Sequence, residues 1–396
     1  MRGTSVTLIC TKVGKTLKWK KIVTSTVPVT STLPVNRISP SECKLPTSDG
    51  RGDIASGFPR VQERMRTTGT VIAKIILVDF SDAPATKSPA EAFSMISPGP
   101  TEVFSYMSYG KLNYQMEPML TWFRMSKPSS EYSFSTFEGH RAYIAEAVAL
   151  ADPHVDFSAT ESIVVLANPD AKKLTFGPAF TPTGGRGFTL DGKYIANAAT
   201  SGHDLNVWGS IWLNHEITHT LGIVDLYASH KENPNDPYHA IFRYTGNFSY
   251  MGNLNPKSNA PGLLAWERWV LGWLDDDQII CHRQGSTTVL LQPIGGIVGV
   301  KAIVIPIGKT KAVVVESRRA EGYDTKLVKS GALVYTVDTS VESGLGPIRV
   351  FPANSDDPLR LLAPRGEGES VEVEGVRITV KKSDNSGDLV EISIGQ

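Results

Sequence analysis

The sequence predicts an α+β fold, in which a domain with a mixed sheet and helices is followed by a small all-β, sandwich-like domain. Strand-like and helix-like runs alternate from Gly69 to Leu274, as is typical of a sheet covered by helices. Six strand-like runs then follow one another in about 110 residues, which favours a sandwich or barrel. Hydrophobic residues make up 41% of the 396 residues, enough for a large core.

Residues 1–66 mix Thr, Ser, Val and Pro without a sustained hydrophobic period. We interpret them as a poorly structured N-terminal arm or leader. Their short apolar run, Val6 to Cys10, is shorter than the hydrophobic core of a secretory signal. The tripeptide Arg51-Gly52-Asp53 resembles an integrin-binding sequence, but tripeptides recur by accident and we favour a simple turn.

We expect the first folded domain over residues 67–280. The run 70–80 is rich in β-branched and aliphatic residues and predicts a buried strand, as does the run 162–168. An apolar period of helical type predicts a helix over 138–152. Further expected elements are short helices around 90–96 and 103–110, strands over 112–125 and 194–200, a helix from Gly209, and an amphipathic helix over 261–274 with Trp266, Val270 and Trp273 on one stripe.

The all-β domain is expected over residues 281–396, after the acidic run Asp275 to Asp277. Oxygen ligands of this kind suit Ca²⁺, but we favour a solvated acidic turn. The strand-like runs lie at 287–294, 300–307, 311–319, 331–339, 371–380 and 388–394.

The composition excludes several classes of protein. Forty Lys and Arg balance forty Asp and Glu, so no basic excess points to nucleic acid as the main partner. No run of 18 apolar residues predicts a membrane span. Three cysteines are too few for a disulfide scaffold or a zinc ribbon. We hypothesise a disulfide between Cys43 and Cys281 that ties the arm across the domain junction, which implies an oxidising, extracellular setting.

The strongest functional signal is the string HEITHTLGIVD at residues 215–225. His215 and His219 are four residues apart, so a helix presents both imidazoles on one face, where they can occupy two vertices of a zinc site. Glu216 lies beside the first ligand and is placed to take a proton from water activated by the metal. This pattern is typical of zinc metalloproteases.

A third zinc ligand is needed, because catalytic zinc sites usually have three protein ligands and water. Gly222 is placed to end the helix in a left-handed turn, which brings Asp225 beneath the metal. We therefore favour Asp225, with Tyr227 and His230 as alternatives within reach. The nearby His203 and His239 are more simply solvated loop histidines.

The extended motif resembles that of the immune inhibitor A-like metalloproteases, a metzincin family in which Asp follows the glycine and an acidic-aromatic tail follows, here Asp225-Leu226-Tyr227. In FSYMGN (248–253), Met251 lies 32 residues after His219 and fits the methionine turn beneath the zinc. Further similar segments are LVDFSD, SYGKLN, the helix ending in LGWL, VVVESRRAEGYD and GALVYTVD. The resemblance covers roughly residues 70–394.

The resemblance implies a secreted zinc endopeptidase that acts on protein or peptide substrates, and we expect a monomer. Glu216 is the catalytic base, and Gly222 and Met251 support the site. Some metzincins use a tyrosine near the methionine turn to stabilise the transition state, which makes Tyr250 a candidate, although a packed turn aromatic is the favoured alternative. We expect an extended substrate in the cleft near Met251, paired with an edge strand at 194–200.

Two other functions are considered. One is a catalytically inactive binding or adhesion protein with a protease fold, against which the intact His215, Glu216, His219 and Asp225 argue. The other is a metal-dependent amidase that acts on small substrates.

Overall fold

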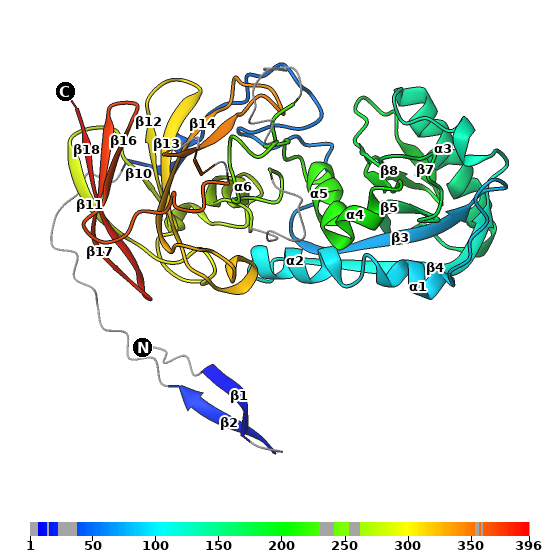
Figure 1. The fold of residues 1–396 in the computed structure, drawn as a ribbon, viewed down its shortest axis with the longest axis horizontal. Coiled ribbons are helices and arrows are strands. Elements are labelled where there is room, and N and C mark those ends of the chain that lie inside the picture. Colours follow the sequence, from blue (N-terminus) through cyan, green and yellow to red (C-terminus); the bar gives the residue numbers. More distant parts are fainter. Residues whose placement is uncertain are drawn as a thin grey trace. The chain divides into compact units, whose positions relative to one another are not determined.

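The computed structural model describes residues 7–13, 16–22, 38–229, 241–252, 262–352, 356–357 and 359–395. The chain divides into two compact units, residues 1–37 and 38–396. In the first unit, β1 (Thr7–Val13) and β2 (Thr16–Ile22) pair in an antiparallel manner (Figure 1). All further elements belong to the second unit.

A five-stranded sheet forms the framework of the region that carries the motif. Its order is β4-β3-β5-β9-β6, with β4, β3, β5 and β9 parallel and β6 antiparallel to β9. The strands are β3 (Gly69–Asp79), β4 (Leu112–Arg124), β5 (Thr160–Ala167), β6 (Ala179–Phe180) and β9 (Ala198–Thr200). The strands expected at 70–80 and 162–168 are confirmed to within two residues.

Helices cover both faces of this sheet, which explains why β3 is apolar on both of its sides. Ile76 and Val78 pack with α3 (Phe137–Ala151). Ile75 and Leu77 face the opposite core, which contains residues of α1 (Pro89–Ser94), α2 (Gly99–Met107), α4 (Leu205–Trp208) and α5 (Ser210–Thr220). The α+β class is confirmed (Figure 1). Within the described ranges, no helix has the length and apolar character that crossing a membrane requires.

Two further sheets form the C-terminal region, in the orders β10-β12-β13-β14-β15 and β11-β18-β17-β16. Their facing side chains share one core, as expected of a sandwich. The strands are β10 (Ile279–Cys281), β11 (Ser286–Leu291), β12 (Ala302–Pro306), β13 (Lys311–Arg318), β14 (Gly331–Asp338), β15 (Ile348–Phe351), β16 (Ser370–Val373), β17 (Val376–Asp384) and β18 (Gly387–Ile394).

The first of these sheets is buried on both faces. In β13, Val313 and Val315 face the sandwich core, whereas Ala312 and Val314 join the core that also holds α2, α5 and α6 (Ala265–Val270). One continuous core therefore crosses the boundary that we expected at residue 280. That residues 281–396 fold as a separate domain stays a prediction.

Short elements complete the second unit. β7 (Phe188–Leu190) pairs with β8 (Lys193–Ile195), so the strand expected over 194–200 is split between β8 and β9. The 3-10 helices are η1 (Pro40–Cys43), η2 (Ser129–Glu131), η3 (Asp152–His154), η4 (Asp276–Gln278) and η5 (Gly322–Asp324).

Residues 38–66 differ from the poorly structured arm that we expected, because they pack into the core. Cys43, Leu45, Ile54 and Met65 are all buried there. These side chains reach the core singly from an irregular segment, so their spacing leaves no strand or helix period to recognise. The predicted pairing of Cys43 with Cys281 is confirmed, with 5.7 Å between their Cα atoms.

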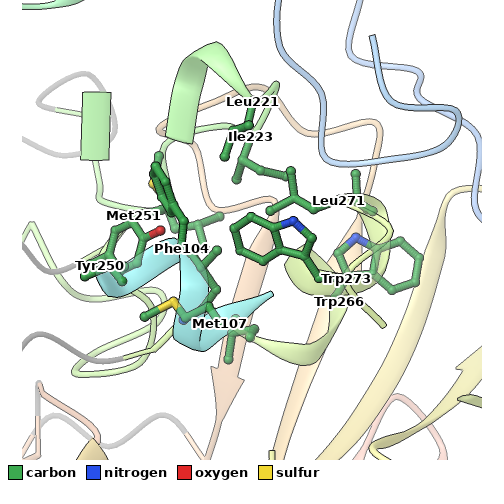
Figure 2. Close-up of a cluster of buried hydrophobic side chains, with 14 of the residues drawn as sticks. Phe104, Met107, Leu221, Ile223, Tyr250, Met251, Trp266, Leu271 and Trp273 are labelled. Carbon is green, nitrogen blue, oxygen red and sulfur yellow. The ribbon is translucent and has the colours of Figure 1, made fainter. Parts of the chain in front are cut away.

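The helix expected over 261–274 is reduced to α6. Its six residues are all buried, including Glu267 and Arg268, so the expected polar face does not exist. Figure 2 shows Trp266, Leu271 and Trp273 in the same buried cluster as Phe104 and Met107 of α2. The ring centroids of Trp273 and Phe104 lie 6.0 Å apart. Residue 261 lies outside the described ranges.

The disulfide should contribute strongly to stability, because it closes a loop with a sequence separation of 238 residues. We expect the variant with both Cys43→Ala and Cys281→Ala to lose about 5 kcal/mol of unfolding free energy, measured by denaturant titration. Reduced wild-type protein should fall to the same level, and the double variant should not respond to reductant. Equal unfolding midpoints of oxidised and reduced wild-type protein would contradict this expectation.

Candidate metal centre

The helix α5 carries the motif and is buried on nearly every side. Trp212, Leu213 and Ile217 pack in the main core, which holds the helix rigidly in place. The helix is followed by Gly222, whose φ of +103° confirms the expected left-handed turn. A Cβ at this position would also lie only 3.2 Å from side-chain atoms of Arg60 and Arg64, so both conformation and space favour glycine.

This turn brings three potential ligands together. His215 Nε2 lies 3.1 Å from Asp225 Oδ1 and 3.1 Å from His219 Nε2. His219 Nε2 lies 3.0 Å from Asp225 Oδ1. Ligand atoms about 2.0–2.2 Å from a tetrahedral zinc stand about 3.3–3.6 Å apart, a little further than the three atoms of this triangle. Two nitrogens and one carboxylate oxygen in a triangle of this size therefore fit a small divalent cation such as zinc.

Backbone carbonyls orient the two imidazoles. His215 Nδ1 lies 3.2 Å from the carbonyl oxygen of Tyr250, and His219 Nδ1 lies 2.7 Å from that of Ile223. Because a carbonyl can only accept, each Nδ1 carries a proton, and each Nε2 faces the centre of the triangle. Such outer partners are typical of metal-binding histidines.

The carboxylate of Asp225 is held by a residue that the sequence did not reveal. Ser343 Oγ donates to Asp225 Oδ2 at 3.0 Å and accepts the Asp225 backbone N–H at 2.9 Å. Ser343 lies 118 residues further along the chain, after β14. No local pattern marks a serine in this role.

The electrostatics of the triangle favour a cation at its centre. Burial opposes charge on Asp225, but the positive charge of His219 outweighs it and holds the pKa of Asp225 well below its usual range. Burial would also lower the pKa of His219, but Asp225 reverses the effect and raises it to about 9. The carboxylate thus retains its charge and, with the imidazoles, can exchange protons for a metal ion.

Glu216 lies beside the triangle, as the motif predicts. Its Oε2 accepts the backbone N–H of Ala179 in β6 at 2.6 Å, which fixes the carboxylate between α5 and the sheet. Burial raises the pKa of Glu216 above its ordinary value. A carboxylate of raised pKa is a stronger base, as proton abstraction from water requires.

A cavity of about 380 Å³ opens on this centre. Its walls come from residues 38–66, here called the N-terminal segment, from the chain around β6, from the start of α4, and from the motif and the residues that follow it. The lining residues are Arg51, Asp53, Ile54, Phe176, Gly177, Pro178, Ala179, Thr181, Asp204, His215, Glu216, His219, Asp225 and Tyr227.

The strand beside the cavity is not the one that we expected. The run 194–200 was expected at the edge, but β9 lies between β5 and β6 inside the sheet. The edge strand is β6, and Ala179 of β6 lines the cavity. The sequence could not reveal β6, because a strand of two residues is too short for an alternating pattern.

Met251 lies behind the centre rather than in the cavity. It is fully buried and packs in the core near Tyr250 and Met107 (Figure 2). Its carbonyl oxygen accepts the N–H of Leu226 at 2.9 Å. The Met251 turn therefore supports the chain immediately after Asp225.

Tyr250 and Tyr227 differ in their access to the cavity. The Tyr250 hydroxyl lies 2.9 Å from Thr218 Oγ1 in the core, and Tyr250 is not part of the cavity wall. This position favours the packed turn aromatic over a stabiliser of the transition state. Tyr227 does line the cavity, with its ring 5.9 Å from that of His215.

The other candidates from the sequence lie elsewhere. His203 Nδ1 lies 3.1 Å from the Pro169 carbonyl oxygen and takes no part in the triangle. His230 and His239 lie outside the described residues. In the acidic run, Asp275 and Asp276 accept from Lys111 and Lys44 at 2.8 Å and 2.9 Å, so two of the carboxylates proposed for Ca²⁺ are paired with lysines.

The N-terminal segment binds the C-terminal end of α5, a contact that the sequence did not reveal. The terminal carbonyls of a helix lack partners within the helix. Ala55 N–H donates to Gly222 O and Met65 N–H to Thr220 O, both at 2.9 Å, while Arg60 Nη1 donates to Leu221 O at 3.0 Å. These bonds fix the turn that joins the two histidines to Asp225.

The RGD tripeptide also lies at the cavity. Arg51 forms an ion pair with Asp53, and Asp53 accepts from Thr181 Oγ1 at 3.3 Å. The turn that we favoured for this tripeptide is thus part of the cavity wall.

Comparisons with known proteins leave the family open. No protein-family model matches the chain, and no curated protein matches it. Among similar solved structures are two of OgpA from Akkermansia muciniphila. The catalytically inactive form in complex with an O-glycopeptide substrate, glycodrosocin, is 10% identical, with a TM-score of 0.30, and the match covers 74% of this chain and 90% of that chain. The wild-type form is 11% identical, also with a TM-score of 0.30, over 73% and 88%.

Metal binding can be tested directly on the three ligands. We expect the wild-type chain to bind one zinc ion. Asp225→Ala should weaken binding by more than about 100-fold, because losing a ligand should cost more than losing an outer partner. Competition with a chromophoric chelator measures the affinity. His203→Ala is the matched control and should bind as the wild type does. Retention of zinc by Asp225→Ala together with its loss in His230→Ala would instead assign the third ligand to His230.

The role of Ser343 gives a second test. Ser343→Ala removes the hydroxyl that fixes the Asp225 carboxylate and should weaken zinc binding about tenfold. Ser340→Ala is a matched control, because the hydroxyl of the exposed Ser340 bonds Asp338 instead. The role is refuted if the two variants bind zinc equally well.

Proposed function

We propose that this protein is a zinc-dependent endopeptidase. The observation that carries the proposal is the convergence of His215, His219 and Asp225, with Glu216 beside them, on a cavity bordered by an edge strand. Membership in the immune inhibitor A-like metzincins is part of this proposal. It is supported by the motif and by the turn at Met251, which lies behind the ligands.

The metal ligands and Glu216 have different roles in this proposal. His215, His219 and Asp225 would hold the zinc ion, which would supply Lewis acidity to polarise a carbonyl group and to make water more acidic. Glu216 uses its Oε1 to take the proton from the attacking water, since Oε2 is held by Ala179. Glu216 then delivers the proton to the amine that leaves.

The position of β6 favours a polypeptide substrate over a small amide. An exposed strand edge can pair with an extended peptide through main-chain hydrogen bonds. Because Ala179 of β6 already touches Glu216, a peptide along this edge would bring its scissile bond close to the base. The intact Glu216 also favours an enzyme over an inactive binding protein.

The disulfide supports an extracellular site of action. Cys43 and Cys281 are joined in the structure, and disulfides persist mainly in oxidising compartments. We therefore propose that the protein is secreted, with proteins or peptides as substrates.

The role of Glu216 is tested by Glu216→Gln. The amide oxygen can still accept the Ala179 N–H, so the fold and zinc affinity should remain. Casein hydrolysis should fall by about 10²–10⁴-fold, because the variant has no general base. A chelator should abolish wild-type activity, and added zinc should restore it.

The same assay separates the alternatives. A wild-type protein that binds zinc but hydrolyses neither casein nor small amides would support the inactive binding protein. Hydrolysis of small amides alone would support the amidase.

A further inference from the structure

The turn formed by residues 248–252 controls two parts of the metal centre. The carbonyl oxygen of Tyr250 accepts from His215 Nδ1, and that of Met251 accepts from the N–H of Leu226, the residue after Asp225. A displacement of this turn would therefore disturb one imidazole ligand and the backbone of the carboxylate ligand together.

The conformation of the turn depends on Ser249. Its φ of +68° lies in the left-handed region, although it is not a glycine, and such a conformation persists only when the surroundings impose it. Ser249 Oγ accepts the N–H of Met251 at 3.2 Å and donates to Glu267 Oε1 at 3.0 Å. The hydroxyl thus bridges the turn to α6.

Glu267 is a buried carboxylate that the proposed chemistry does not use. It is 1% exposed. Its Oε1 accepts from Ser249, and its Oε2 accepts the backbone N–H of Leu264 at 2.8 Å. Burial raises its pKa to about 7, which reflects the cost of placing an acidic group there. Since burying Glu267 is unfavourable, its position between Ser249 and Leu264 points to a role in fixing the turn.

We propose that Glu267 is a positioning residue of the metal centre, acting through Ser249 and the Met251 turn on His215 and Asp225. The inference rests on the proposed function only in that it requires a metal at the three ligands. It extends the site to a helix whose residues do not touch the cavity.

The helix that carries Glu267 is itself anchored by the sheet β10-β12-β13-β14-β15. Glu316 of β13 accepts the N–H of Ala265 at 2.6 Å and the hydroxyl of Tyr335 at 2.7 Å. Arg318 donates to Glu316 at 2.5 Å and, through a second nitrogen, to Asp324 at 2.6 Å. Support therefore passes from β13 and β14 to α6, from α6 to the turn, and from the turn to the ligands.

The alternative is that Glu267 only caps α6. Glu267→Gln separates the two roles, because the amide oxygen can still accept the Leu264 N–H but the other terminal atom becomes a donor facing Ser249. Ser249→Gly also distinguishes the two roles, because it removes the hydroxyl that links the turn to Glu267. Glycine relieves the left-handed conformation, so a purely structural role predicts an unchanged or more stable turn.

The experiment is a double-mutant cycle on zinc affinity. Each single variant should bind zinc about tenfold more weakly than the wild type, and the double variant should be no weaker than either, because both changes break one link. The visible spectrum of the Co²⁺-substituted protein should shift in all three variants. Tyr114→Phe is the control, since it removes a buried hydroxyl that bonds Ser162 in the other sheet and has no part in this chain of support. It should lower the thermal midpoint and leave affinity and spectrum unchanged.

Each outcome is informative. Wild-type affinity in both Glu267→Gln and Ser249→Gly, with zinc bound tightly by the wild type, overturns the positioning role and leaves the proposed function intact. Additive losses, or a loss as large in Tyr114→Phe, also overturn it. A wild-type chain that binds no zinc defeats the proposed function itself. If Glu267→Gln does not fold, weaker zinc binding in a stable Ser249→Gly supports the link, and unchanged binding refutes it.

Discussion

The structure depends on keeping three polar side chains together in a largely buried place. His215 and His219 are 2% and 8% exposed, and their ring nitrogens meet the carboxylate of Asp225. Burying such groups is unfavourable unless each finds partners. The Nδ1 atoms use the carbonyls of Tyr250 and Ile223, and the remaining ring nitrogens and carboxylate oxygen converge. A divalent cation is the partner that this donor set suits best.

This constraint explains why remote parts of the chain share one core. The turn after α5 is held by Ala55 and Arg60 of the N-terminal segment. The Asp225 carboxylate is held by Ser343, which follows β14. A disulfide and a continuous hydrophobic core join these regions. The centre therefore belongs to the whole second unit, and none of the three sequence segments that we distinguished contains all of its supports.

The site is more informative about function than the fold is, because the same fold can host unrelated activities. The geometry of Glu216 illustrates this. Its carboxylate is fixed by the edge strand β6 and lies beside His215, so the proposed base, the candidate metal ligands and a strand edge occur together.

The sequence by itself determined the features that local spacing controls. Residues four apart on a helix must share a face, which placed His215 and His219 together, and only a left-handed turn at Gly222 returns the chain to Asp225. Continuous apolar runs revealed β3 and β5, because a strand buried on both faces needs apolar residues along its own length. Tertiary structure alone decided that β6 is the edge, that Tyr227 rather than Tyr250 reaches the cavity, and that Ser343 and residues 38–66 support the ligands. These choices depend on contacts between residues far apart in the chain, and such contacts leave no period or spacing in the sequence.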